Sequence, residues 1–298
     1  MLIHRFSGDS GTMAGMTKKE RIIMNRISRR SFVKLGALSA LSTVSGARGS
    51  SAPKGEEKII LGMASYTLRA FPREQALQMT KRVGLSYIAF KNFHLALDAS
   101  KDEIDLALAQ VKEQGLTLYG GGVIYMKNKQ EVEQAFNYAS LAGMKVIIGA
   151  PQTDLLDLVE EKVKQYDIKV AIHNHGPGDD VYPTPESVYE KVKKLDRRIG
   201  LCMDIGHTQR IGANPVADIK KYADRLHDMH IKDVSASTAE GSTVEIGRGV
   251  IDIPGVFKAL LDIQYKGVAS FEYEKDEKDP LPGLAESVGY VKGVLRML

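Results

Sequence analysis

Residues 168–180 read IKVAIHNHGPGDD, an apolar run that ends in polar residues and then breaks into a glycine-containing turn. A short, nearly continuous run of valine, alanine and isoleucine predicts a strand that is buried on both faces. The next segment, TPESVYEKVKKL at residues 184–195, has the spacing of an amphipathic helix and a proline in its first turn. This strand followed by a helix is the repeating unit from which we predict the fold.

The same unit recurs from residue 59 to the end of the chain. Strands are predicted at residues 59–65, 85–90, 116–123, 144–150, 168–175, 199–206, 226–233 and 267–274. Helices are predicted at residues 73–84, 101–115, 129–143, 155–166, 184–195, 215–225, 253–263 and 285–298. Eight such units in about 245 residues favour an α/β protein, a single-domain (β/α)₈ TIM barrel. A doubly wound open sheet is the alternative, but no G-x-G-x-x-G motif follows the first strand.

Composition excludes several classes of protein. The 298 residues are 43% hydrophobic, enough for a large core, and a single cysteine, Cys202, excludes an internal disulfide and a multi-cysteine zinc site. Cys202 lies in an apolar run and is interpreted as a small buried hydrophobe. Residues 1–47 carry eight basic and two acidic side chains, so the overall charge of +4 leaves −2 on the remainder. The rest of the chain is weakly acidic and lacks the excess of basic residues that binds nucleic acid, so no nucleic-acid partner is expected.

The N-terminal region has the layout of an export signal. Residues 28–34 read SRRSFVK and precede a mildly apolar stretch that is shorter than the ~20 residues of a membrane span. This string resembles a twin-arginine signal, and Ser45–Ala47 offer an A-x-A-like cleavage site. We therefore expect residues 1–52 to be an N-terminal extension and signal peptide, and residues 53–298 to be the barrel. The expected location is periplasmic or extracytoplasmic, with no stable membrane insertion.

Metal-ligating side chains gather at the ends of the last four predicted strands. His173, Asp204, His230 and Glu272 occur on consecutive strands, and small residues lie two positions before three of them. Because the carboxyl ends of barrel strands form the active-site face, these side chains are expected to converge at its mouth. Two imidazoles and two carboxylates suit one divalent ion (Mn²⁺, Co²⁺, Zn²⁺ or Mg²⁺), and imidazole favours a transition metal.

Several motifs carry a resemblance to a known family. These are DIGH at 204–207, HIKD at 230–233, EIGRGVIDIP at 245–254 and SFEYE at 270–274. Together they resemble the sugar phosphate isomerase/epimerase family with a xylose-isomerase-like barrel, over essentially residues 58–298. The resemblance implies that Asp204, His230 and Glu272 are metal ligands. Where many relatives have a glutamate on the fifth strand, this sequence has His173, so the paired glutamates that such epimerases use as acid and base are reduced to Glu272.

Because His173 replaces this glutamate, the sequence does not determine which residue is the second proton-transferring group. His175 or Glu274, further out on the same faces, could supply it, and so could Lys232, while His207 could orient Asp204 or contact substrate. The candidate catalytic residues are therefore Glu272, His175, Lys232 and His207. The candidate substrate-binding residues are Lys91, His94, Arg210, Glu245, Arg248 and Glu274.

The predicted function is that of a divalent-metal-dependent carbohydrate isomerase or epimerase. It would remove a proton next to a carbonyl of a small sugar or keto sugar, non-phosphorylated because the location is extracytoplasmic. The same first step permits a lyase, dehydratase or hydratase acting on a keto sugar or keto-glycoside. A DNA repair enzyme of the endonuclease IV type and a non-catalytic sugar-binding barrel are remoter alternatives. A homo-oligomer is compatible with the sequence.

Overall fold

The computed structural model describes residues 59–298. The predicted signal peptide within residues 1–52 lies outside this range, so export stays a prediction. No helix of the described part is long and apolar enough to span a membrane.

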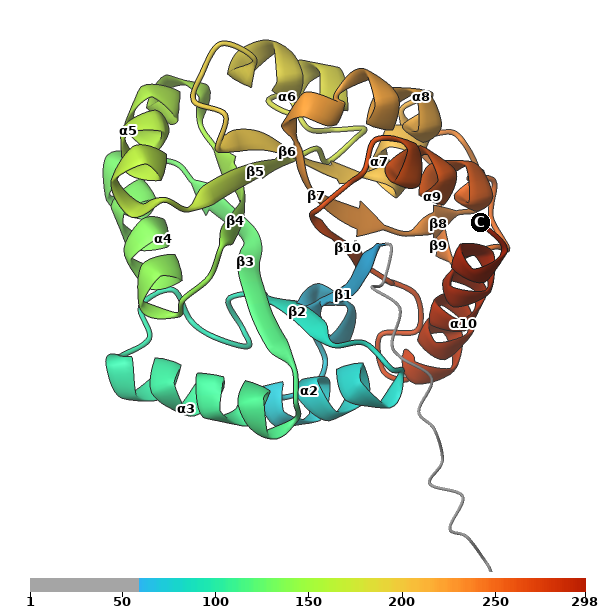
Figure 1. The fold of residues 1–298 in the computed structure, drawn as a ribbon, viewed down its shortest axis with the longest axis horizontal. Coiled ribbons are helices and arrows are strands. Elements are labelled where there is room, and N and C mark those ends of the chain that lie inside the picture. The colour runs from blue at the N-terminus through green and yellow to red at the C-terminus, as the bar shows by residue number, and fades with distance from the viewer. Residues whose placement is uncertain (1–58) are drawn as a thin grey trace, which may run out of the picture. The chain divides into compact units, whose positions relative to one another are not determined.

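Eight parallel strands close into a barrel, as predicted (Figure 1). Around the barrel the strand order is β1-β10-β7-β6-β5-β4-β3-β2, and β1 pairs with both β2 and β10 to close it. The barrel strands are β1 (Ile60–Ala64), β2 (Tyr87–Phe90), β3 (Thr117–Met126), β4 (Val146–Pro151), β5 (Lys169–His173), β6 (Ile199–Asp204), β7 (Leu226–Ile231) and β10 (Val268–Phe271). Every predicted strand is present, and most are a few residues shorter than predicted.

Helices surround the barrel and cover its outer face (Figure 1). They are α2 (Arg73–Arg82), α3 (Lys101–Glu113), α4 (Lys129–Leu141), α5 (Leu156–Tyr166), α6 (Pro185–Val192), α8 (Pro215–Lys221), α9 (Ile253–Asp262) and α10 (Leu281–Met297). Short 3₁₀ turns lie at η1 (Ser65–Leu68), η2 (Thr153–Leu155) and η3 (Ala223–Arg225). Two elements are additional to the predicted ones: helix α7 (Ile205–Arg210), and a small hairpin of β8 (Asp233–Val234) and β9 (Thr243–Val244).

The helix ends follow local chemistry. Ser100 and Glu103 form a capping box at the start of α3, and Thr184 and Ser187 form one at the start of α6. Helix α3 ends before Gly115, whose φ of +65° is costly for other residues. These signals explain why the predicted helix boundaries fall within a few residues of the observed ones.

The barrel interior is filled by small and medium side chains below a polar layer. Ala171 and Cys202 are fully buried in a cluster inside the barrel, and Ser270 is also buried. Their positions two residues before His173, Asp204 and Glu272 confirm the predicted alternation of faces. Among these close-packed side chains lies one buried carboxylate, Asp228, whose Oδ2 contacts Cys202 Sγ and the Tyr119 hydroxyl at 3.5 Å.

Asp233, the last residue of the HIKD motif, fixes the EIGRG loop. Its buried carboxylate accepts hydrogen bonds from the backbone N–H groups of Val234 (2.9 Å), Gly247 (2.9 Å), Gly249 (3.0 Å) and Ile251 (3.2 Å). A Cβ at position 249 would lie 2.1 Å from an Asp233 oxygen, so only glycine permits this approach. The two motifs are therefore one structural unit.

Replacing Asp233 by alanine is expected to lower the free energy of unfolding by roughly 3 kcal/mol, because buried N–H groups lose a charged acceptor. Asp252→Ala is the matched control, since the exposed Asp252 accepts only from Gly255 at the start of α9 and its loss costs about 1 kcal/mol. Urea unfolding of both variants measures the difference. Equal losses would show that Asp233 is an ordinary cap.

Candidate metal centre and pocket

The structure brings together the four residues predicted to bind a metal. His173 ends β5, Asp204 ends β6, His230 lies on β7 and Glu272 follows β10 directly. One ligand atom from each lies within 4.8 Å of those of the others, and all four side chains are buried. The closest contacts join His230 Nδ1 to Glu272 Oε2 at 3.1 Å and His173 Nε2 to Asp204 Oδ2 at 3.5 Å.

The polar atoms of this cluster fit a bound cation. Nδ1 of His173 and Nε2 of His230 are buried without a hydrogen-bond partner in residues 59–298, and the polar contacts of His173 Nε2, His230 Nδ1 and Asp204 Oδ2 are to each other, to Glu272 and to Lys232. Buried polar atoms are rarely left unpaired, and such a convergence of lone pairs is what a metal ion satisfies. Mixed nitrogen and oxygen donors suit a divalent transition metal better than Mg²⁺.

Asn174, which sequence reasoning missed, holds Asp204 in place. Its Oδ1 accepts a hydrogen bond from the Asp204 N–H at 3.0 Å, and its Nδ2 donates to Thr208 Oγ1 at 3.2 Å. Asp204 Oδ1 accepts from the His207 N–H at 2.8 Å and caps α7, while Oδ2 points to the other residues of the candidate metal centre. The sequence held one clue to this role: Asn174 is a polar residue at a strand end, and alternation places its side chain on the face opposite to those of His173 and His175.

Lys232 places a positive charge against this cluster. Its ammonium lies 3.1 Å from Asp204 Oδ2 and 2.8 Å from Glu272 Oε2, and it also pairs with Glu274. Although burial opposes it, these carboxylates raise the pKa of Lys232 well above its usual value. This environment keeps Lys232 protonated, which suits a fixed positive charge better than the proton-transferring role predicted from the sequence as one possibility. Three carboxylates and one ammonium leave two negative charges, which a divalent ion would balance.

The ligand side chains have shifted pKa values. Burial would raise the pKa of Asp204 and Glu272, but Lys232 and the neighbouring imidazoles lower both. Burial lowers the pKa of His173 to about 3, so that ring is neutral at physiological pH. Although burial opposes it, Glu272 raises the pKa of His230. A proton on His230 would therefore compete with a metal ion, and binding the ion would release it.

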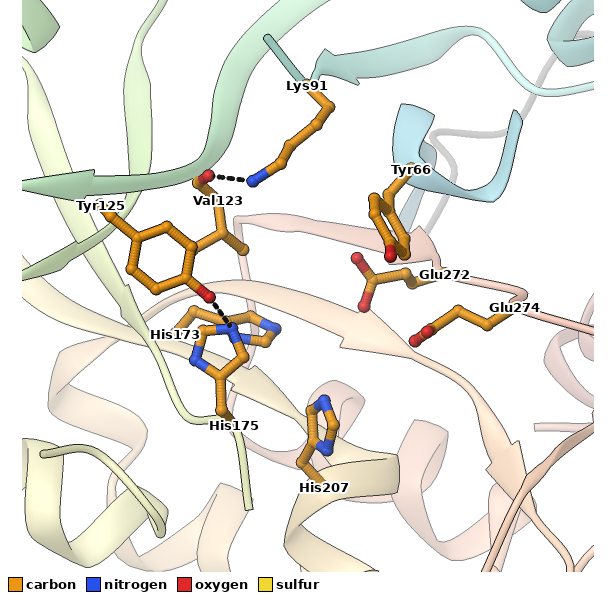
Figure 2. A pocket seen from close by; sticks show the side chains of 9 residues that line it. All are labelled: Tyr66, Lys91, Val123, Tyr125, His173, His175, His207, Glu272 and Glu274. Atoms are coloured by element: carbon orange, nitrogen blue, oxygen red, sulfur yellow. Dashed lines mark hydrogen bonds between the residues drawn. The ribbon is translucent and has the colours of Figure 1, made fainter. Parts of the chain in front are cut away.

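A pocket of about 340 Å³ opens above the cluster. In Figure 2, Glu272 and Glu274 lie on one side of it, and Tyr125, His175 and His173 lie on the other. Its lining residues are Tyr66, Lys91, Val123, Tyr125, His173, His175, His207, Glu272 and Glu274. The volume is at the lower end for small-ligand sites, and both polar walls face the same space.

The wall opposite Glu272 is ordered by a chain of contacts. Figure 2 shows the contact between His175 Nε2 and the Tyr125 hydroxyl, at 3.1 Å. On the other side of the ring, Asp179 Oδ2 lies 3.3 Å from His175 Nδ1. Beside them the Lys91 ammonium donates to the Val123 carbonyl. Tyr125 was missed because β3 continues to Met126, three residues beyond the predicted strand end.

The other predicted substrate-binding residues are divided between three places. His94 is buried away from the pocket, where its Nε2 lies 3.0 Å from the Phe71 carbonyl. Glu245 binds Lys275 at 2.7 Å, and Arg248 pairs with Glu286 on the surface at 2.5 Å, so neither lines the pocket. Arg210 lines an adjoining cavity.

Comparison with known proteins agrees with this geometry. Residues 153–294 match the family model described as the xylose isomerase-like TIM barrel. The fold is a xylose isomerase-like TIM barrel. An inosose dehydratase of Clostridium beijerinckii is 31% identical over 126 residues, which are 37% of this chain and 41% of that protein. The match thus spans less than half the length of this curated relative.

Several solved structures have a fold similar to that of this chain over most of its length. The crystal structure of the IolI protein with a bound zinc atom has a TM-score of 0.68 at 18% identity, and covers 80% of this chain and 99% of that one. The structure of L-ribulose 3-epimerase has a TM-score of 0.66 at 17% identity, and covers 80% and 95%. At these identities the likeness establishes the fold alone.

We expect one divalent ion per chain, and His173→Ala is expected to weaken its binding by about 100-fold or more, since losing even a residue that supports a ligand costs 10–100-fold. Affinity is also expected to fall as pH falls, because protons compete for His230. Titration with Co²⁺, followed by its absorption spectrum, measures both effects.

His227→Ala is the matched control, because His227 contacts the Arg197 carbonyl at the opposite end of the barrel. Unchanged Co²⁺ binding in His173→Ala would remove His173 from the ligand set.

Proposed function

We propose that this protein is a divalent-metal-dependent enzyme that removes a proton from the carbon next to a carbonyl of a carbohydrate or cyclic polyol. The observation that carries the proposal is the buried His173, Asp204, His230 and Glu272 set at the floor of a polar pocket. When bound there, a divalent ion would polarise the substrate carbonyl and acidify the neighbouring C–H group.

Glu272 is the proposed base. It lines the pocket, and its lowered pKa keeps it ionised, although the same shift makes it a weaker base. Lys232 holds Glu272 and Glu274 by ion pairs, so both carboxylates keep a fixed position beside the substrate. Lys91, from the far side of the pocket, is placed to bind a substrate oxygen.

Loss of water is the outcome that we favour. The curated relative reported above is an inosose dehydratase, and only one carboxylate of the ligand set lines the pocket. After Glu272 takes the proton, a hydroxyl on the next carbon would leave with a proton supplied from the opposite wall. His175, oriented by Asp179, is the proposed donor in its protonated form, which burial disfavours by lowering its pKa; its Nε2 contacts the Tyr125 hydroxyl, through which the proton would pass.

Epimerisation is the second candidate, and the position of His175 favours it. An epimerase needs one proton-transferring group on each face of the reacting carbon, and Glu272 and His175 lie on opposite sides of the pocket (Figure 2). The L-ribulose 3-epimerase likeness agrees with this possibility. The first step is shared, and the two outcomes separate only afterwards.

Solvent deuterium exchange tests the shared step. With an inosose and a panel of keto sugars, the metal-loaded protein is expected to exchange the proton beside the carbonyl. Glu272→Gln is expected to slow this exchange by about 10²–10⁴-fold, because a positioned base is lost. Glu286→Gln, an identical change on the exposed surface, is the control.

Mass spectrometry then separates the outcomes. A dehydratase releases one water from the exchanging substrate, whereas an epimerase returns a stereoisomer of unchanged mass. Absence of metal-dependent exchange with every compound would contradict the proposed function.

A further inference from the structure

A second cavity adjoins the pocket. It measures about 480 Å³ and shares His207 and Glu274 with the first pocket as lining residues. Its other walls come from α7, through Arg210, from the end of the barrel strand β7, through Lys232, and from the β8–β9 hairpin, whose residues 241–244 line it. The two cavities therefore lie on either side of the His207 and Glu274 side chains.

The charge of the second cavity differs from that of the first. Arg210, Lys232 and Lys275 line it against the single carboxylate of Glu274, whereas the first pocket has one lysine against two glutamates. Lys232 is neutralised by the carboxylates of the metal cluster, and Lys275 is bound by Glu245 at 2.7 Å. These pairs leave Arg210 as the lining cation without an ion-pair partner in residues 59–298, although Glu274 lines the same cavity and the exposed Glu240 acts on Arg210 at longer range.

Arg210 is held in place without using its charge. One terminal nitrogen, Nη2, donates to the Ala239 carbonyl at 2.5 Å, which ties the side chain to the loop of the hairpin. Its Nε is buried and has no hydrogen-bond partner in residues 59–298, and no carboxylate of that range lies within 4.0 Å. Because Nε has almost no accessible surface, an anion in the cavity would be bound through the more exposed terminal nitrogens, by charge-assisted hydrogen bonds.

We propose that this second cavity is a subsite for an anionic group, a carboxylate or a phosphate ester, carried by the substrate at a distance from its reacting carbon. The inference rests on the proposed function, since it places the reacting part in the first pocket. A substrate chain or ring would pass His207 and Glu274 to reach Arg210. Glu274 shares the Lys232 ammonium with Asp204 and Glu272, so its repulsion of the anion is reduced but not removed.

Binding to the metal-free protein tests the subsite independently of catalysis. The probes are D-glucuronate, inorganic phosphate and D-glucose, and isothermal titration calorimetry measures their affinities for the wild type, Arg210→Gln and Arg197→Gln. We expect D-glucuronate, phosphate or both to bind more tightly than D-glucose. Arg210→Gln is expected to weaken that binding by about tenfold or more, because a charge-assisted contact is lost.

Arg197→Gln is the matched control, since Arg197 is exposed before β6 at the opposite end of the barrel. It is expected to bind all three probes like the wild type. Preference for D-glucuronate identifies an acidic sugar as the ligand class, and preference for phosphate identifies a phosphate ester. The proposal is overturned if D-glucose binds as well as both anions, if no anion binds, or if Arg210→Gln retains the anion affinity. Because no metal is present, these failures are distinguishable from a failure of the exchange experiment.

Discussion

Asp204 pairs with His230, and His230 pairs with Ser270, in a parallel ladder that continues around the whole barrel. Backbone hydrogen bonds between parallel strands bring all carboxyl ends to one edge, whatever the side chains are. Side-chain alternation then decides which residues point inward. The candidate metal centre is a consequence of these two rules acting on β5, β6, β7 and β10.

The net charge of the side chains above that ladder changes from negative at the candidate metal centre to positive near Arg210. At the centre, Lys232 leaves the three neighbouring carboxylates with two uncompensated negative charges. Further out, Lys275 and Glu245 cancel, and Arg210 remains positive. The mouth of the barrel thus passes from a region that attracts a cation to one that attracts an anion. That arrangement orients any ligand that carries both a metal-binding oxygen pair and an acidic group.

The order of elements and the metal cluster could be predicted from the sequence because both follow from local periodicity. Ala171 and Cys202 lie on the faces that alternation assigns to them, and His173 and Asp204 follow on the same faces. The partners of exposed or loop residues could not be predicted in this way. His94 turns to the Phe71 carbonyl through tertiary packing, and Asn174 acts through a neighbouring strand. Such contacts depend on which strands are adjacent in space.

The closure of the barrel by β1 and β10 also has a consequence for the order of events during synthesis. Pairing of Ile60 with Val268 joins the first described strand to one near the end of the chain, so during synthesis this pair can form only after nearly the whole barrel has been made. Glu272 belongs to that final strand's end. A chain that ends before Glu272 therefore lacks one of the four candidate ligands, and full affinity for a divalent ion is expected only once this strand has been made.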